Sequence, residues 1–393
     1  MTGGAQPLDV FIVAGEESGD VLGAGLMAEL KTLYPGEVRF RGVGGARMQG
    51  HGLAGIFPME DITAMGFAQV IGSLPRILRR MRQTIDAILA RPPDILVMVD
   101  APDFTHRVAR RVRARLPSLP IVKYVAPTVW VWRPGRARAM APDFDRVLAV
   151  LPFEPQAMHA LGGPHTTYVG HPLLGERDRL RPNAEEAVRR EAQPPVLLVL
   201  PGSRRAELER LGAAFGEVLR RLQPRAPDLD LVLPTLPQRL AQVEKLVASW
   251  PVRPRIVVDD EEKRAAFRVA RAALAASGTV TLELALAGIP TVAAYKVPWL
   301  EGRIAPYFIR VKTAILPNLI LGEPAVPEYL QWNVDPPAMA AQLERLIDGG
   351  PERQRQLAAF ARLDAVMGED GAPPSRRAAR AVLETLAARR RPV

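Results

Sequence analysis

The chain has 393 residues, enough for two domains of ordinary size, and a globular mixture of 48% hydrophobic and 24% charged residues. It contains no cysteine, which excludes disulfides and thiolate metal sites. Lysine and arginine number 52 against 42 acidic residues, and this net charge of +10 favours acidic partners such as phosphorylated substrates, anionic lipid or nucleic acid.

Membrane-spanning and secretory segments are not expected from the pattern. No apolar run approaches the roughly 20 residues that cross a bilayer, and the first ten residues lack the basic stretch and apolar core of a secretory signal. We therefore expect a protein that is soluble or peripheral to a membrane.

Short apolar runs alternate with helical patterns over nearly the whole chain, which predicts an α/β fold with parallel sheets covered by helices. In the first half the expected strands are residues 10–14, 38–43, 95–100, 121–125 and 147–151. In the second half they are residues 196–200, 231–234, 256–258, 273–276 and 291–295. The polar stretch from about 175 to 195 is predicted to be the linker, and the tail from about 336 to be helical.

The first expected strand runs into a loop of small and acidic residues, and a helical pattern follows at once. Ligands of open α/β sheets bind beyond the carboxyl ends of the strands, so the side chains of this loop stand where chemistry is expected. They are Glu16, Glu17, Ser18 and Asp20. The same residue types also suit a helix cap, which leaves a purely structural role open.

Residues 65–83 mix apolar anchors with arginines. The apolar positions include Met65, Phe67, Val70, Ile71 and Leu74, and the basic ones include Arg76, Arg79 and Arg80. Such a mixture suits adsorption to anionic lipid or a groove for acyl chains, but a core helix with a solvated basic face fits equally well. Nucleic acid is less favoured, because no aromatic platform or recognition helix accompanies the arginines.

An acid ends the third expected strand. A carboxylate at the end of a central strand is costly unless it is hydrogen-bonded or functional. We therefore favour Asp100 as a general base, and Asp103 as a helix cap. His106 and His171 are the other candidate bases, while the five histidines of the chain show no metal-ligand spacing.

Two turns in the second half each follow a strand and open a helix. They are formed by Gly202, Ser203 and Arg204, and by Ser277, Gly278 and Thr279. Amide groups at a helix N-terminus, with hydroxyls and a guanidinium beside them, suit a diphosphate, although neither turn matches a P-loop or dinucleotide fingerprint and a plain turn stays open. Glu283, one turn into the second helix, suits a ribose diol; an ordinary solvated helix acid is the alternative.

Taken in order, nine motifs resemble lipid-A-disaccharide synthases, the inverting glycosyltransferases of outer-membrane lipid synthesis. The motifs are AGEESGDVLGAGL, MEDITAMGF, VDAPDF, YVAPTVWVWR, LPFE, VGHP, LPGSRRAE, SGTVTLE and LPNLI. The resemblance runs from about residue 9 to about residue 333. Glu17 stands where the family commonly has Ala, which puts a catalytic role for Glu17 in doubt, and Thr128 stands where Ser is usual.

The resemblance implies a GT-B fold, with two Rossmann-like domains facing across a cleft. Residues 1–174 would bind the acceptor and meet the membrane, residues 175–351 would bind the UDP-sugar, and helices from about 352 to 393 would pack back on the first domain.

The implied reaction joins UDP-2,3-diacylglucosamine to 2,3-diacylglucosamine 1-phosphate (lipid X), with inversion and release of UDP, and without a metal or other cofactor. The implied location is the cytoplasmic face of the inner membrane, on an anionic lipid surface and with no nucleic-acid partner. The resemblance leaves both a monomer and a homodimer open.

In that reaction Asp100 would take the proton of the acceptor 6-hydroxyl, and Ser18 and Glu16 would position a sugar. The two turns would hold the diphosphate and Glu283 the ribose. Asn318 and Gln331 would complete the nucleotide-sugar pocket, as the matching family positions suggest.

Two other classes of protein stay open on the sequence alone. A UDP-sugar 2-epimerase, or another UDP-GlcNAc-using GT-B enzyme, would share the architecture but would need no acyl groove. A basic module that only binds lipid or nucleic acid would leave Asp100 and Glu283 unexplained.

Overall fold

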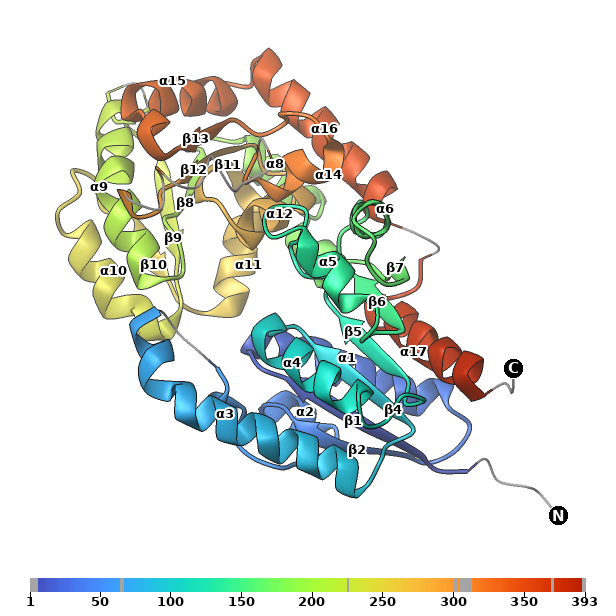
Figure 1. The fold of residues 1–393 in the computed structure, drawn as a ribbon. Helices are drawn as coiled ribbons and strands as arrows, with labels where there is room; N and C mark the ends of the chain where they lie inside the picture. Colours follow the sequence, from blue (N-terminus) through green and yellow to red (C-terminus); the bar gives the residue numbers. More distant parts are fainter. Residues whose placement is uncertain are drawn as a thin grey trace. The chain divides into compact units, whose positions relative to one another are not determined.

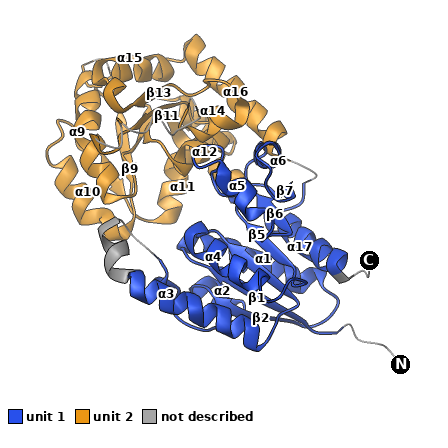
Figure 2. Cartoon of the chain, viewed as in Figure 1, with its two compact units in different colours: residues 1–172, 370–393 blue, residues 173–369 orange. Residues whose placement is uncertain are grey.

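The computed structural model describes residues 6–63, 67–224, 226–299, 303, 311, 313–368 and 371–390, with only the backbone for 67–73 and 390. The chain divides into two compact units, Met1–Pro172 with Asp370–Val393, and Leu173–Glu369 (Figure 2). Each unit is a Rossmann-like layer of parallel strands with helices on both faces, as the alternating pattern predicts (Figure 1).

The first unit contains a seven-stranded parallel sheet in the order β3-β2-β1-β4-β5-β6-β7. Its strands are β1 (Leu8–Ala14), β2 (Val38–Val43), β3 (Leu53–Gly55), β4 (Ile95–Val99), β5 (Ile121–Tyr124), β6 (Arg146–Ala149) and β7 (Thr166–Tyr168). The central strands β1 and β4 are buried along nearly their whole length because helices cover both faces. The edge strands β3 and β7, with three residues each, are too short to show in the pattern.

Helices on both sides of this sheet complete the first unit. They are α1 (Glu17–Leu33), α2 (Ala46–Gly50), the 3₁₀ helix η1 (Met59–Asp61), α3 (Phe67–Ala90), α4 (Pro102–Arg113), α5 (Gly135–Met140), α6 (Glu154–Ala160) and α17 (Pro374–Arg390). Helix α1 packs against α17, and α3 packs against α4. The C-terminal helix α17 therefore belongs to the fold of the first unit.

The second unit contains a six-stranded parallel sheet in the order β10-β9-β8-β11-β12-β13. Its strands are β8 (Val196–Leu200), β9 (Asp230–Pro234), β10 (Arg255–Val257), β11 (Ala270–Ala276), β12 (Thr291–Tyr295) and β13 (Glu328–Leu330). Successive residues of β8 alternate between two cores: Leu197 and Val199 join one, and Val196, Leu198 and Leu200 the other. A strand buried on both faces produces this continuous apolar run.

The helices of the second unit also lie on both faces of its sheet. They are η2 (Pro172–Gly175), α7 (Arg177–Leu180), α8 (Ala184–Glu191), α9 (Arg205–Leu222), η3 (Pro237–Arg239), α10 (Leu240–Val247), α11 (Asp260–Val269), α12 (Thr279–Leu286), α14 (Leu316–Leu321), η4 (Gln331–Asn333), α15 (Pro336–Ile347) and α16 (Pro351–Met367). Helix α9 packs with α10 and α15, and α11 packs with α7 and α8.

The stretch from 175 to 195 is not the linker that its composition suggests, because it forms α7 and α8 of the second unit. Asn183 begins α8 with a capping box shared with Glu186. The buried guanidinium of Arg190 donates to four backbone carbonyls at 3.0 to 3.2 Å. Charged residues that look solvated in the sequence here satisfy the backbone.

Helix α16 also departs from the expected organisation. It packs against α12, α14 and α15 of the second unit, so α17, but not α16, lies on the first unit. The side-chain amide of Gln356 accepts from the N–H of Thr291 at 2.9 Å and donates to its carbonyl at 3.1 Å, which ties α16 to the start of β12. The division of the chain therefore falls after Pro172 and Glu369, rather than near 174 and 352.

Candidate active site

The loops that follow β1 and β4 meet at the carboxyl edge of the first sheet. Ala14 pairs with Val99 at the ends of these strands. A Cβ placed on Gly15 would lie only 2.6 Å from the Cβ of Ala101, so this close approach requires glycine. The AGEESGD loop therefore lies directly beside the residues around Asp100.

The polar residues of the AGEESGD loop divide into two kinds. Glu16 stands at the N-cap position of α1 and Ser18 in its first turn, and both side chains are exposed. Asp20 is buried and accepts the backbone N–H groups of Gly45 and Met48 at 2.8 and 3.1 Å. The Asp20 carboxylate thus fixes the start of α2, whereas Glu16 and Ser18 face solvent.

The backbone at Asp100 is strained. Asp100 and Ala101 have φ of 44° and 43°, and Val125, at the end of the neighbouring strand β5, has φ of 74°. Left-handed geometry costs an L-residue about 1–2 kcal/mol and tends to cluster at functional sites. Within the described part of the chain, the half-buried carboxylate of Asp100 has no hydrogen-bond or ion-pair partner.

A buried amine lies beneath this strained turn. Lys123, on β5, is fully buried; its Nζ donates to the carbonyl of Asp100 and to Thr105 Oγ1, the latter at 3.1 Å. The Thr105 hydroxyl lies within hydrogen-bond distance of two carbonyls of the turn, that of Asp100 at 2.9 Å and that of Ala101 at 3.0 Å. Burial lowers the pKa of Lys123 to about 7, and the Asp100 carboxylate opposes this shift.

The two histidines considered as bases are poorly suited to that role. Burial, with a smaller contribution from Lys123 and Arg136, lowers the pKa of His106 to about 3. Burial also lowers the pKa of His171 to about 4. Asp103 is exposed at the start of α4 and pairs with Arg136 at 3.0 Å, so Asp100 is the carboxylate whose setting suits a base.

The expected membrane segment is described only in part. Met65 lies outside the described residues, as do the side chains of Phe67, Val70 and Ile71. Farther along α3, Leu74 and Leu78 are 44% and 40% exposed, beside the exposed Arg76 and Arg79.

Arg80 is bound more tightly within the fold than Arg76, whose exposed guanidinium lies 3.7 Å from the same Asp61 carboxylate. Its guanidinium donates to the carboxylate of Asp61 at 2.5 and 2.8 Å and to Gln83 Oε1 at 2.7 Å. It also lies 4.8 Å from the centre of the Phe57 ring. Arg80 therefore anchors α3 to η1, and its charge is largely compensated.

The carboxyl edge of the second sheet gathers the residues expected to bind UDP. Leu200 pairs with Ala275, and Tyr295 with Leu330. The turns after β8 and β11, and the residues after β12 and β13, therefore lie side by side along one edge. This is the edge where open α/β sheets bind nucleotides.

The first turn at this edge already holds an acid of its own. Gly202 has φ of 120°, and the backbone N–H groups of Ser203 and Arg204 donate to Glu207 Oε2 at 3.1 and 3.2 Å. The Arg204 guanidinium lies 3.3 Å from Glu207 Oε1, and its side chain is 81% exposed. The backbone N–H groups expected to hold a diphosphate are thus already hydrogen-bonded to the nearby Glu207 carboxylate.

The second turn presents a mixed set. The Ser277 hydroxyl donates to the carbonyl of Ala314 at 2.8 Å, while Gly278 and Thr279 are exposed. Glu283 is half-buried, and its Oε1 accepts a hydrogen bond from Lys263 Nζ of α11 at 2.7 Å. Glu283 is therefore an oriented ion-pair partner, not the freely solvated acid of the alternative interpretation.

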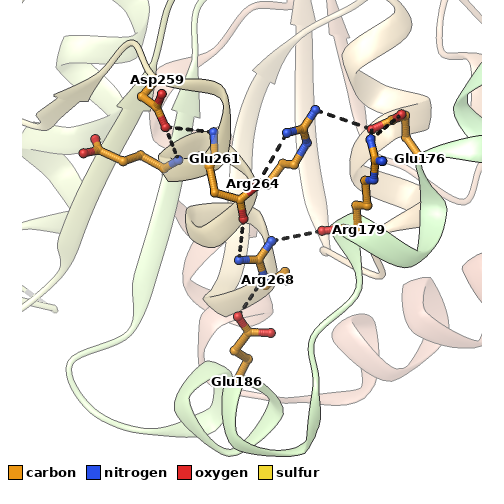
Figure 3. A network of polar contacts seen from close by, with 8 residues as sticks. Glu176, Arg179, Glu186, Asp259, Glu261, Arg264 and Arg268 are labelled. Atoms are coloured by element: carbon orange, nitrogen blue, oxygen red, sulfur yellow. Dashed lines mark hydrogen bonds and ion pairs between the residues drawn. The ribbon is translucent and has the colours of Figure 1, made fainter.

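Helix α11, which carries Lys263, is anchored on its other side by a network of charges (Figure 3). Arg268 contacts Glu186 of α8 at 2.7 Å and Glu261 at 3.1 Å, and Arg264 lies 3.5 Å from Glu176. These contacts hold α11 against α7 and α8. They fix the helix from which Lys263 reaches Glu283.

Asn318 and Gln331 both pair with backbone. The side-chain amide of Asn318 accepts from the N–H of Val326 at 2.7 Å and donates to its carbonyl at 2.9 Å. Gln331, with φ of 50°, makes the same pair of contacts to Val297, at 2.7 and 3.4 Å. Asn318 is buried, so its geometry favours shaping the surrounding loops over direct contact with a ligand.

No group of three or more His, Asp or Glu side chains among the described residues is arranged to hold a metal ion. No helix within the described ranges is long and apolar enough to cross a membrane.

Known proteins resemble this chain over nearly all of its length. A family model described as lipid-A-disaccharide synthetase matches residues 10–369. The chain belongs to the lipid-A-disaccharide synthase family. The lipid-A-disaccharide synthase of Nitrobacter hamburgensis is 56% identical over 98% of this chain and 97% of its own. That of Rhodopseudomonas palustris is 52% identical over 98% and 99%.

Membership in the lipid-A-disaccharide synthase family makes the chain a glycosyltransferase. Among solved structures, the UDP-GlcNAc 2-epimerase of Neisseria meningitidis bound to UDP-GlcNAc has a TM-score of 0.62, covering 98% of this chain and 100% of its own at 12% identity. At that identity the likeness concerns the fold alone. It agrees with the GT-B architecture expected from the sequence.

This member of the lipid-A-disaccharide synthase family holds three charged residues in structured settings that pattern analysis did not single out. Lys123 and Lys263 lie beside Asp100 and Glu283. Glu154 is buried, which raises its pKa to about 7, and it accepts the indole N–H of Trp130 at 3.3 Å together with two backbone N–H groups. The available signal for Lys123 and Glu154 was a charged residue within each of the short runs IVKY and LPFE.

Proposed function

We propose that this chain transfers the diacylglucosaminyl group of UDP-2,3-diacylglucosamine to the 6-hydroxyl of 2,3-diacylglucosamine 1-phosphate. The products are UDP and a β-1,6-linked disaccharide 1-phosphate. The observation that carries the proposal is the family match over residues 10–369, which spans both sheets and both candidate edges.

Asp100 is the general base of this reaction. It takes the proton of the 6-hydroxyl while the hydroxyl oxygen attacks C1 of the donor sugar. The bond from C1 to the diphosphate oxygen breaks, and its electron pair leaves with UDP. Attack opposite the leaving group inverts the configuration at C1. The carboxylate of Asp100, directly after β4, supports this role because it is half-buried and has no hydrogen-bond or ion-pair partner among the described residues.

Glu16 and Ser18 position a substrate sugar next to the base. Their exposure, and the close approach of Gly15 to Ala101, support this placement. Neither side chain needs to exchange a proton, because a hydroxyl and a carboxylate are sufficient to hold sugar hydroxyls by hydrogen bonds.

UDP binds at the carboxyl edge of the second sheet. Glu283 accepts hydrogen bonds from the hydroxyls of the ribose, and Arg204 neutralises the negative charge that develops on the departing diphosphate. The exposed guanidinium of Arg204 and the exposed turn at Gly278 and Thr279 support a diphosphate site here. Asn318 and Gln331 shape the pocket through the backbone of Val326 and Val297.

The enzyme acts at an anionic lipid surface, where its acylated substrates reside. The exposed Leu74 and Leu78 beside Arg76 and Arg79 support contact through α3. The surface in question is the cytoplasmic face of the inner membrane, where UDP-sugars are present.

The direct test incubates the purified full chain with both substrates and a chelator, and analyses the products by mass spectrometry. We expect equal amounts of UDP and of disaccharide 1-phosphate. Release of UDP without a disaccharide would contradict the proposed acceptor. Conversion of UDP-GlcNAc to its 2-epimer, with no transfer, would favour the epimerase alternative.

A further inference from the structure

Lys123 is a buried amine that the reaction described above does not use. Its side chain is fully buried in β5, and its hydrogen-bond partners are a backbone carbonyl and a hydroxyl rather than a carboxylate. Burial of an amine without a paired carboxylate is costly, and an apolar side chain of similar length would fill the core better. If the side chain at position 123 only filled space in the core, a lysine would not be needed there.

The partner of the amine is the carbonyl of the strained residue. Asp100 and Ala101 are consecutive left-handed residues without glycine. The Asp100 carbonyl accepts from Lys123 and from Thr105 Oγ1, and the Asp100 N–H donates to the carbonyl of Tyr124 at 2.9 Å. The peptide groups on both sides of the Asp100 Cα are therefore held by the fold.

Holding these peptide groups fixes the direction of a side chain. The orientation of a Cα–Cβ bond follows from the backbone around it, so a relaxed turn would move the carboxylate even if every other contact stayed intact. A shift of about 1 Å in a reacting group costs up to roughly 100-fold in rate.

We propose that Lys123, together with Thr105, is a positioning residue that holds the Asp100–Ala101 turn in its left-handed conformation and thereby aims the Asp100 carboxylate at the acceptor hydroxyl. The inference rests on the proposed function, in which Asp100 is the base. Lys123 is too deeply buried to touch a substrate, so it acts through Asp100 alone.

The test removes each donor without changing side-chain volume, in the full-length enzyme. Lys123→Met and Thr105→Val should each lower kcat by roughly 10- to 100-fold, with the donor KM within about twofold of wild type. Thr105→Ser, which keeps the hydroxyl, should lose much less than Thr105→Val. The matched control is Thr385→Val on α17, where a buried hydroxyl donates to the carbonyl of Ala381 at 2.7 Å; it should leave kcat unchanged.

The decisive measurement repeats both substitutions in an Asp100→Asn background. Residues that act through Asp100 should cause no further loss once the base is gone. An additional 10-fold loss in that background would overturn the inference, as would full turnover of Lys123→Met and Thr105→Val. If Lys123→Met does not fold, Thr105→Val with and without Asp100→Asn gives the same comparison.

Failure of the inference and failure of the proposed function give different results. Normal turnover of Asp100→Asn would remove the base itself, and the inference with it. An inactive Asp100→Asn with fully active Lys123→Met and Thr105→Val would overturn the inference and leave the proposed function standing.

Discussion

The carboxyl edges of the two sheets differ in how far their polar side chains are hydrogen-bonded within the protein. At the edge of the first sheet, the backbone around Asp100 is strained and the carboxylate has no partner among the described residues. At the edge of the second sheet, Glu207, Glu283 and Gln331 all make hydrogen bonds within the unit. The first edge thus presents a carboxylate without a hydrogen-bond partner among the described residues. The carboxylates of Glu207 and Glu283 at the second edge are already hydrogen-bonded.

This difference matches the two tasks of a transferase. A base must keep proton affinity, so partners that stabilise its charged form would weaken it. A binding site benefits from side chains that are already held in position, because less freedom is then lost when the ligand arrives. The predictions below test each half of this contrast, from the largest expected effect to the smallest.

The contrast depends most strongly on Asp100. We expect Asp100→Asn to lower kcat by roughly 10²- to 10⁴-fold, as for a lost general base, with nearly unchanged affinity for UDP. Turnover is measured by disaccharide formation and affinity by calorimetry. Asp103→Asn, on the first turn of α4, is the control and should cost little. Equal losses for the two variants would contradict the special role of Asp100.

The ion pair at the second edge should control affinity rather than chemistry. We expect Glu283→Ala to weaken UDP binding by roughly 10- to 100-fold, because a charged hydrogen-bond partner of the ribose is lost. Lys263→Met should have a smaller effect in the same direction, since Glu283 stays but is less well oriented. UDP and its 2′,3′-dideoxyribose analogue should bind Glu283→Ala equally well. A persistent preference for UDP would place the ribose elsewhere.

The exposed arginines of α3 should govern membrane association. We expect Arg76→Gln with Arg79→Gln to reduce binding to anionic vesicles by roughly 30-fold, from about 1 kcal/mol for each of the two charges near the surface. The measurement is vesicle sedimentation at physiological salt. The matched control is Arg205→Gln with Arg220→Gln, which removes two exposed arginines of α9. An equal loss of vesicle binding in this control would mean that only the net charge of the protein matters, not the position of the arginines on α3.

Glu207 tests whether the occupied amides belong to the binding site. If the diphosphate takes the N–H groups of Ser203 and Arg204, the Glu207 carboxylate must first leave them. Glu207→Gln keeps a capping side chain but removes a repelling charge, so UDP should bind a few-fold more tightly. Unchanged or weaker binding, measured by calorimetry, would mean that the diphosphate lies elsewhere along this edge.

The buried amine of Lys123 should also make the stability of the protein depend on pH. The pKa of Lys123 is about 7 in the folded chain against 10.5 for its ordinary value, so the unfolded chain binds more protons between these limits. Stability due to this group is therefore lowest below pH 7 and rises toward pH 10.5. Lys123→Met should remove that rise, giving a Tm advantage of a few degrees at pH 7 that shrinks by pH 9.5. A constant difference in Tm would contradict the shift.

Apolar patterning was sufficient to predict the architecture. Continuous apolar runs such as residues 196–200 are typical of strands covered on both faces, and their alternation with helical segments predicts parallel sheets. Because Asp100 follows such a run, the sequence alone predicts that it lies at the carboxyl edge of a sheet. The order of the motifs was sufficient to recognise the family.

Partners of polar side chains were decided only by the tertiary structure. Lys123 meets Asp100 from a position 23 residues away, Lys263 meets Glu283 across 20, and Gln331 meets Val297 across 34. A local sequence pattern indicates whether a residue is expected to be buried. It does not indicate which group, distant in the sequence, that residue will contact. Arg80 and Arg190 looked like solvated charges for this reason, and the fold uses both of them inside.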